Sequence, residues 1–77
     1  MKEIAILGTG CNKCERLAAN AAEAVADLGL DCSLRKVTEV SEIIAYGVMM
    51  TPALAIDGEV KSVGKVLDVT AIKEMLR

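Results

Sequence analysis

The feature that most constrains the fold is a cysteine pair placed between an apolar run and an alanine-rich segment. The apolar run within Glu3–Leu7 is followed by Gly8-Thr9-Gly10 and then by Cys11 and Cys14. A short continuous apolar run closed by glycine predicts a strand buried on both faces, and then a turn. The sequence therefore predicts a strand, a turn and a helix that begins at the two thiols.

The helix after the thiols is predicted from a change in spacing. Between Asn12 and Leu28, apolar residues recur at helical intervals, as in Leu17, Ala21 and Val25. Polar residues occupy the positions between them, and a glycine follows the last apolar residue. We therefore expect one helix over residues 12–28, closed by glycine.

A second strand and a short helix are expected next. Polar and apolar residues alternate from Cys32 to Val37, which predicts a less buried strand at an edge of the sheet. Thr38 is suited to cap the following helix, which ends at Tyr46-Gly47. Cys32 is expected to be a core cysteine rather than a third redox centre.

The last third of the chain predicts a hairpin and a helix. Ala53–Ile56 and Glu59–Val63 flank Asp57-Gly58, a strong hairpin signal, and Asp68 is suited to cap a final helix. The first two strands should be parallel because a helix joins them. The order β-α-β-α-β-β-α predicts an α/β fold, a four-stranded mixed sheet flanked by helices on both faces, in a single domain over residues 1–77.

Composition and charge exclude several classes of function. The 77 residues carry nine basic and eleven acidic side chains, a net charge of −2, and no run of Lys or Arg. This pattern does not favour a nucleic-acid partner. The first apolar run is too short for a signal peptide or a membrane span, and three cysteines do not suit a disulfide scaffold. We expect a cytoplasmic monomer with no membrane partner and no cofactor.

The two thiols are placed for disulfide chemistry. The thiolate is the reactive form, and a free cysteine with a pKa near about 8.5 is mostly protonated at neutral pH. Cys11 is expected at the helix N-cap, where backbone N–H groups, the helix dipole and Lys13 would lower the pKa of its thiol to about 7. Lys13 could equally be an ordinary solvated lysine. Cys14 follows one turn later, within reach of a disulfide with Cys11.

A reaction scheme follows from this spacing. We expect Cys11 to attack a substrate disulfide and Cys14 to resolve the mixed disulfide, leaving a Cys11–Cys14 bond. Met49 and Met50 precede Pro52 and are expected either to form an apolar rim where substrates dock or simply to pack the loop. The proline precedes a strand, where its missing N–H is tolerated.

At this point the chain resembles the thioredoxin superfamily, in particular its small, glutaredoxin-sized redox-active disulfide proteins of archaeal and bacterial type. The resemblance spans nearly the whole chain and rests on Gly10–Cys14 (GCNKC), on Tyr46–Leu54 (YGVMMTPAL) and on the order of elements. It implies a cis bond before Pro52, an exposed nucleophile at Cys11, a sheltered Cys14, and a Thr51 backbone that pairs with an extended substrate. It also implies disulfide-bearing client proteins and an electron donor of the thioredoxin reductase type.

Some features depart from that family. Lys13 replaces the proline usual inside the motif, and the first strand offers no carboxylate to stand behind the thiols. The glutathione-binding pattern of glutaredoxins is reduced to Gly64 and Asp68, which disfavours glutathione as the direct reductant.

The competing interpretation is a Cu(I) or soft-metal carrier that uses the same cysteine pair, as in heavy-metal-associated domains. Those domains have the order β-α-β-β-α-β and end in a strand, whereas this chain is expected to end in a helix that begins after Asp68.

Overall fold

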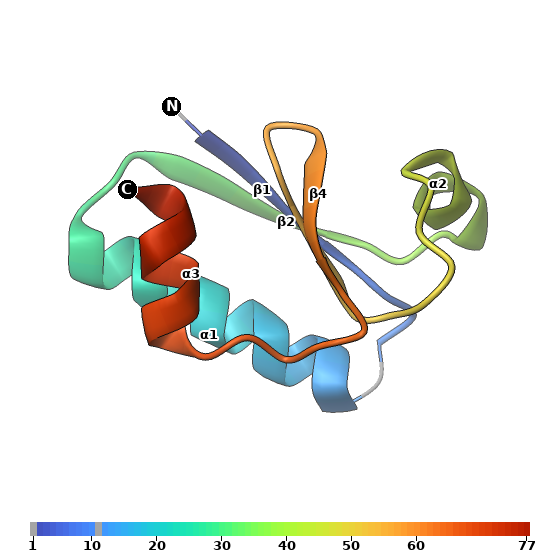
Figure 1. Ribbon diagram of the computed structural model, residues 1–77, viewed down its shortest axis with the longest axis horizontal. Helices are drawn as coiled ribbons and strands as arrows, with labels where there is room; N and C mark the ends of the chain where they lie inside the picture. Colours follow the sequence, from blue (N-terminus) through green and yellow to red (C-terminus); the bar gives the residue numbers. More distant parts are fainter. Residues whose placement is uncertain (1, 11) are drawn as a thin grey trace.

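The first strand lies in the interior of the sheet, which explains its unbroken apolar sequence. The computed structural model describes residues 2–10 and 12–77. The elements of this part of the chain are β1 (Lys2–Leu7), α1 (Asn12–Leu28), β2 (Cys32–Val37), α2 (Val40–Ala45), β3 (Ala53–Ile56), β4 (Glu59–Val63) and α3 (Val69–Leu76). The strands lie in the order β2-β1-β3-β4, with β1 parallel to β2 and antiparallel to β3, and with β4 antiparallel to β3 (Figure 1). The predicted order of elements and the mixed four-stranded sheet are confirmed.

Two aliphatic cores lie on opposite faces of the sheet. Successive side chains of a strand point to opposite faces, so Ile4 and Ile6 enter one core while Ala5 and Leu7 enter the other. The first core is covered by α1 and α3, which contact each other, and the second by α2 (Figure 1). Helices therefore flank both faces of the sheet, as predicted.

The β3–β4 hairpin turns at the predicted dipeptide. Asp57 and Gly58 both have positive φ, 52° and 84°, which is the backbone that a two-residue hairpin turn requires. The Asp57 side chain accepts a hydrogen bond from the Glu3 amide (2.9 Å), and the Asp57 amide donates to the Glu3 carbonyl (2.7 Å). The turn is thereby fixed to the beginning of β1.

The caps of the two short helices differ from each other. Asp68 caps α3 as predicted, and its carboxylate accepts a hydrogen bond from the Ala71 amide at 2.8 Å. The predicted cap at Thr38 is wrong, because the N-cap of α2 is Glu39, which makes no side-chain cap hydrogen bond. The hydrogen bonds between β1 and β2 continue to the Val37 carbonyl, which accepts from the Gly8 amide. Thr38 therefore lies in the connection between β2 and α2, and α2 begins after Glu39.

The strands β2 and β4 form the two edges of the sheet and carry exposed charged side chains. Arg35 and Lys36 lie on β2, while Lys61 on β4 is ion-paired to Glu59 at 3.0 Å. Cys32 is half-buried at the start of β2 and packs against the first core, as predicted.

The chain ends in α3, with no strand after it in the described residues. The order β1-α1-β2-α2-β3-β4-α3 of the described elements differs from the β-α-β-β-α-β order of heavy-metal-associated domains. Within residues 2–10 and 12–77, no helix has both the length and the apolar character needed to cross a bilayer.

The two caps give a paired stability prediction. Asp68→Ala removes the acceptor of the Ala71 amide and should lower the free energy of unfolding by about 1 kcal/mol. Thr38→Ala removes no cap hydrogen bond and should change it by less than about 0.5 kcal/mol. Urea unfolding followed by far-UV circular dichroism measures both values. Equal losses in the two variants would contradict the assignment of the caps.

Candidate functional site

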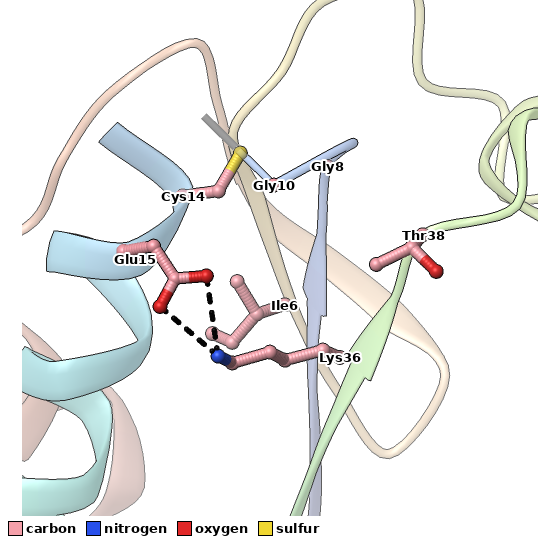
Figure 2. A pocket seen from close by; sticks show the side chains of 7 residues that line it. All are labelled: Ile6, Gly8, Gly10, Cys14, Glu15, Lys36 and Thr38. Atoms are coloured by element: carbon pink, nitrogen blue, oxygen red, sulfur yellow. Dashed lines mark hydrogen bonds and ion pairs between the residues drawn. The ribbon is translucent and has the colours of Figure 1, made fainter. Parts of the chain in front are cut away.

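Cys14 lies in the first turn of α1 with its side chain against the end of β1. It is 5% exposed, and Figure 2 shows its sulfur directed towards the segment that carries Gly8 and Gly10. A β carbon built on Gly8 would collide with Cys14 Sγ, so the sulfur lies almost directly on the glycine backbone. The predicted second thiol is therefore buried where the strand ends and the helix begins.

A small pocket adjoins this sulfur. Its volume is about 20 Å³, which is room for about one water molecule. Figure 2 shows its lining residues, which come from β1, the loop after it, α1, β2 and the link to α2. They are Ile6, Gly8, Gly10, Cys14, Glu15, Lys36 and Thr38.

Glu15 and Lys36 bring charge to the edge of this pocket. The Lys36 Nζ–Glu15 Oε2 distance is 3.2 Å, and both side chains are more than half exposed, so the pair contributes under about 1 kcal/mol to stability. Among residues 2–10 and 12–77, no charged residue is buried. The expectation that no buried carboxylate stands behind the thiols therefore holds for this part of the chain.

Cys11, the predicted nucleophile and N-cap, lies outside the described residues. Lys13 is exposed in the first turn of α1, immediately before Cys14. In the described segments, no group of three or more His, Cys, Asp or Glu side chains could hold a metal ion.

The loop before the hairpin brings Thr51 to the same place. The Thr51–Pro52 peptide bond is cis, as the resemblance implied, and Pro52 is buried. Thr51 is exposed, and its Cβ lies 3.8 Å from the point that a β carbon on Gly8 would occupy. The end of β1, the start of α1 and the loop before β3 therefore meet around Gly8.

The two methionines of this loop have different surroundings. Met49 is 97% exposed, while Met50 is 64% exposed and its side chain lies over Gly64, where an added β carbon would be 3.4 Å from Met50 Cε. Met49 and Thr51 line a broad open groove of about 700 Å³, which Met50 does not line. The described residues that line the groove are Thr9, Val40, Ile43, Ile44, Gly47, Val48, Met49 and Thr51.

The groove extends from the loop after β1 along α2, and none of the described residues that line it is charged. Val40 and Ile44 on α2 are 58% and 64% exposed, which is unusual for large apolar residues of a small domain.

The residue after the C-terminal end of α2 is hydrogen-bonded to β2, because Arg35 Nη2 donates to the Tyr46 hydroxyl at 3.4 Å. That hydrogen bond is the main reason why the pKa of Arg35 is raised.

Sequence reasoning missed three contributors to the site. In the sequence, Gly8 indicates only a turn, and nothing near it predicts that the Cys14 sulfur lies against its backbone. Val40 and Ile44 belong to the apolar spacing that predicts α2, which does not reveal their exposure, because this six-residue helix buries only Ile43. The short length of the predicted helix was an indication that some of its apolar residues would be exposed, because a six-residue helix has few positions that face a sheet.

Comparison with known proteins agrees with this architecture. Residues 2–77 match the family model of a thioredoxin domain. A thioredoxin of Methanothermobacter thermautotrophicus is 43% identical over 76 residues, covering 99% of both chains. A thioredoxin of Methanocaldococcus jannaschii is 43% identical over 77 residues, covering all of this chain and 88% of the relative.

The chain therefore belongs to the thioredoxin family, and its fold is thioredoxin-like. This membership indicates a redox function of the thiol–disulfide oxidoreductase type.

Proposed function

We propose that this protein reduces disulfide bonds of client proteins with the thiols of Cys11 and Cys14. The observation that carries the proposal is the position of Cys14, which is buried in the first turn of α1 and beside Thr51 of the cis-proline loop. Thiols at a helix N-terminus are the ones whose thiolates proteins stabilise. The named thioredoxins among its relatives support the same chemistry.

The reaction proceeds by two thiol–disulfide exchanges. The Cys11 thiolate attacks one sulfur of the client disulfide, a mixed disulfide forms, and the other client sulfur leaves as a thiolate. The Cys14 thiolate then attacks Cys11 Sγ, a Cys11–Cys14 disulfide forms, and the second client sulfur leaves with its electron pair. The client gains two electrons, the protein loses them, and solvent protonates the released thiolates.

The burial of Cys14 supports this division between the two thiols. A sulfur in a residue that is 5% exposed is not accessible to a disulfide on the surface of another protein, whereas it can react with a neighbour in its own chain. Cys11 is accordingly the nucleophile. The positive end of the α1 dipole and the exposed Lys13 ammonium would favour the thiolate of Cys11 over its thiol.

Client binding is assigned to the loop before β3. Thr51 is exposed, and among the described residues no hydrogen bond involves its backbone amide or carbonyl. An extended client segment can pair with these groups as an added strand. Pro52 fixes the loop, and Met50 forms an apolar rim beside it, where a polarisable thioether adapts to different partners.

The groove along α2 extends this binding site. It begins at Thr9 and Thr51, next to Gly8, and its lining among the described residues is uncharged. Client residues flanking the disulfide would place apolar side chains there, against Ile44 and Met49. The oxidised protein would be returned to the dithiol form by a donor of the thioredoxin reductase type.

Cys14→Ser should trap the mixed disulfide, because the sulfur that displaces the client is gone. Insulin reduction should lose its turnover, and a covalent adduct through Cys11 should accumulate on non-reducing gels and in intact-mass spectra. Cys32→Ser is the matched control and should retain activity, since this thiol packs against the first core. Normal turnover by Cys14→Ser would refute the proposed scheme.

Ile44→Ser tests the groove. Burying the rest of this side chain under a client contributes about 1 kcal/mol, so KM for insulin should rise about fivefold while kcat with a small aromatic disulfide stays the same. Val63→Ser is the control, because Val63 is 41% exposed and lies on β4 outside the groove. Equal changes in KM for both variants would contradict a role for the groove.

The electron donor can be identified with the same assay. Insulin reduction should proceed with NADPH and a thioredoxin reductase. With glutathione at an equal concentration of reducing equivalents it should be slower by about tenfold or more, because the glutathione-binding pattern is reduced to Gly64 and Asp68. Faster turnover with glutathione would overturn the assignment of the donor.

A further inference from the structure

Gly8 is a glycine whose backbone conformation does not require glycine. The glycines with positive φ in the described residues are Gly10, Gly29, Gly47, Gly58 and Gly64, and Gly8 is not among them. Its backbone conformation is therefore one that alanine adopts without strain. The reason for a glycine at this position must lie in the space around it.

That space is occupied by Cys14. The position that a β carbon of residue 8 would take overlaps Cys14 Sγ, and it lies 3.2 Å from Cys14 Cβ and 3.8 Å from Thr51 Cβ. No other glycine of the described residues has such a close neighbour. The Cys14 sulfur occupies the space that a side chain at position 8 would fill.

Neither partner can move away from this contact without disrupting the fold. The Gly8 amide donates to the Val37 carbonyl at 3.0 Å, and the preceding Leu7 is fully buried. On the other side, Leu17 and Ala18 anchor the first turns of α1 in the core. A side chain at position 8 would therefore act on the sulfur itself, which can rotate about the Cα–Cβ bond of Cys14.

We propose that Gly8 is a positioning residue for the Cys14 thiol. By lacking a side chain, it keeps the sulfur buried on the end of β1 and next to Thr51. The consequence for the reaction rests on the proposed function: from this position the Cys14 thiolate attacks Cys11 Sγ in the mixed disulfide, the new S–S bond forms, and the client sulfur leaves as a thiolate.

The contact is tested by alkylation, independently of the redox function. In a Cys11→Ser background, Cys14 should react slowly with iodoacetamide, because a buried thiol reacts only through local opening. Adding Gly8→Ala should turn the sulfur outward and accelerate the reaction about tenfold or more, as followed by peptide mass spectrometry. Gly29→Ala is the control for backbone strain: it places alanine at φ +64° but crowds no atom, because none lies within 4 Å of its Cβ position. It should therefore leave the rate near that of the background. An unchanged rate in the Gly8→Ala protein would overturn the proposal.

The effect on resolution is measured with both redox cysteines present. Reduced Gly8→Ala protein, mixed with a disulfide-linked peptide and quenched with acid, should show a mixed disulfide that persists about 10²-fold longer, because small misplacements of a reacting group slow reactions to that extent. Gly29→Ala should resolve at the normal rate. A normal lifetime in Gly8→Ala would overturn the role in resolution. If instead Cys14→Ser turned over normally, the proposed function would be refuted. The alkylation experiment would still show whether Gly8 keeps the Cys14 sulfur buried.

A second variant covers the case in which Gly8→Ala does not fold. Combining Gly8→Ala with Cys14→Ala removes the sulfur and should restore most of the lost stability in urea unfolding. A double variant that stays unfolded would show that the glycine accommodates something other than this thiol, and would overturn the proposal.

Discussion

Burial of β1 on both faces is the constraint on which the rest of the structure depends. Ile4 and Ile6 enter the core under α1 and α3, while Ala5 and Leu7 enter the core under α2, and each is at most 3% exposed. Packing on both faces fixes the position of β1 and of its C-terminal end, and the chain leaves the strand at Gly8. The first turn of α1 and the cis-proline loop are then brought against that point by the same cores.

The site that results has two parts of opposite character. One is a closed contact, in which the Cys14 sulfur lies on the backbone of Gly8 and beside Thr51. The other is the open apolar groove along α2, which is wide enough to accept side chains from a partner. Thr51 belongs to both parts, so a chain bound along the groove would also pass the buried thiol.

Most of the fold was predictable from local patterns. Continuous or alternating apolar runs predicted the strands, helical spacing predicted the helices, and Asp57-Gly58 predicted the hairpin, because these signals depend on neighbours in sequence. The cap at Thr38 was wrong because the β1–β2 ladder runs on to the Val37 carbonyl, a contact between distant residues. The role of Gly8 and the exposure of Ile44 depend likewise on tertiary packing, which no window of the sequence contains. The thiol motif itself is visible in the sequence, while Cys11 lies outside the described residues.

The charged edges of the sheet have a consequence for association between copies. Backbone groups on an outer strand can template fibril-like stacking, and lysine and arginine there discourage it. Arg35 and Lys36 mark one border of this sheet and Lys61 marks the other. Intermolecular strand pairing is therefore disfavoured along both flanks. The proposed pairing of an extended client with the uncharged Thr51 loop would then not compete with self-association through the edges of the sheet.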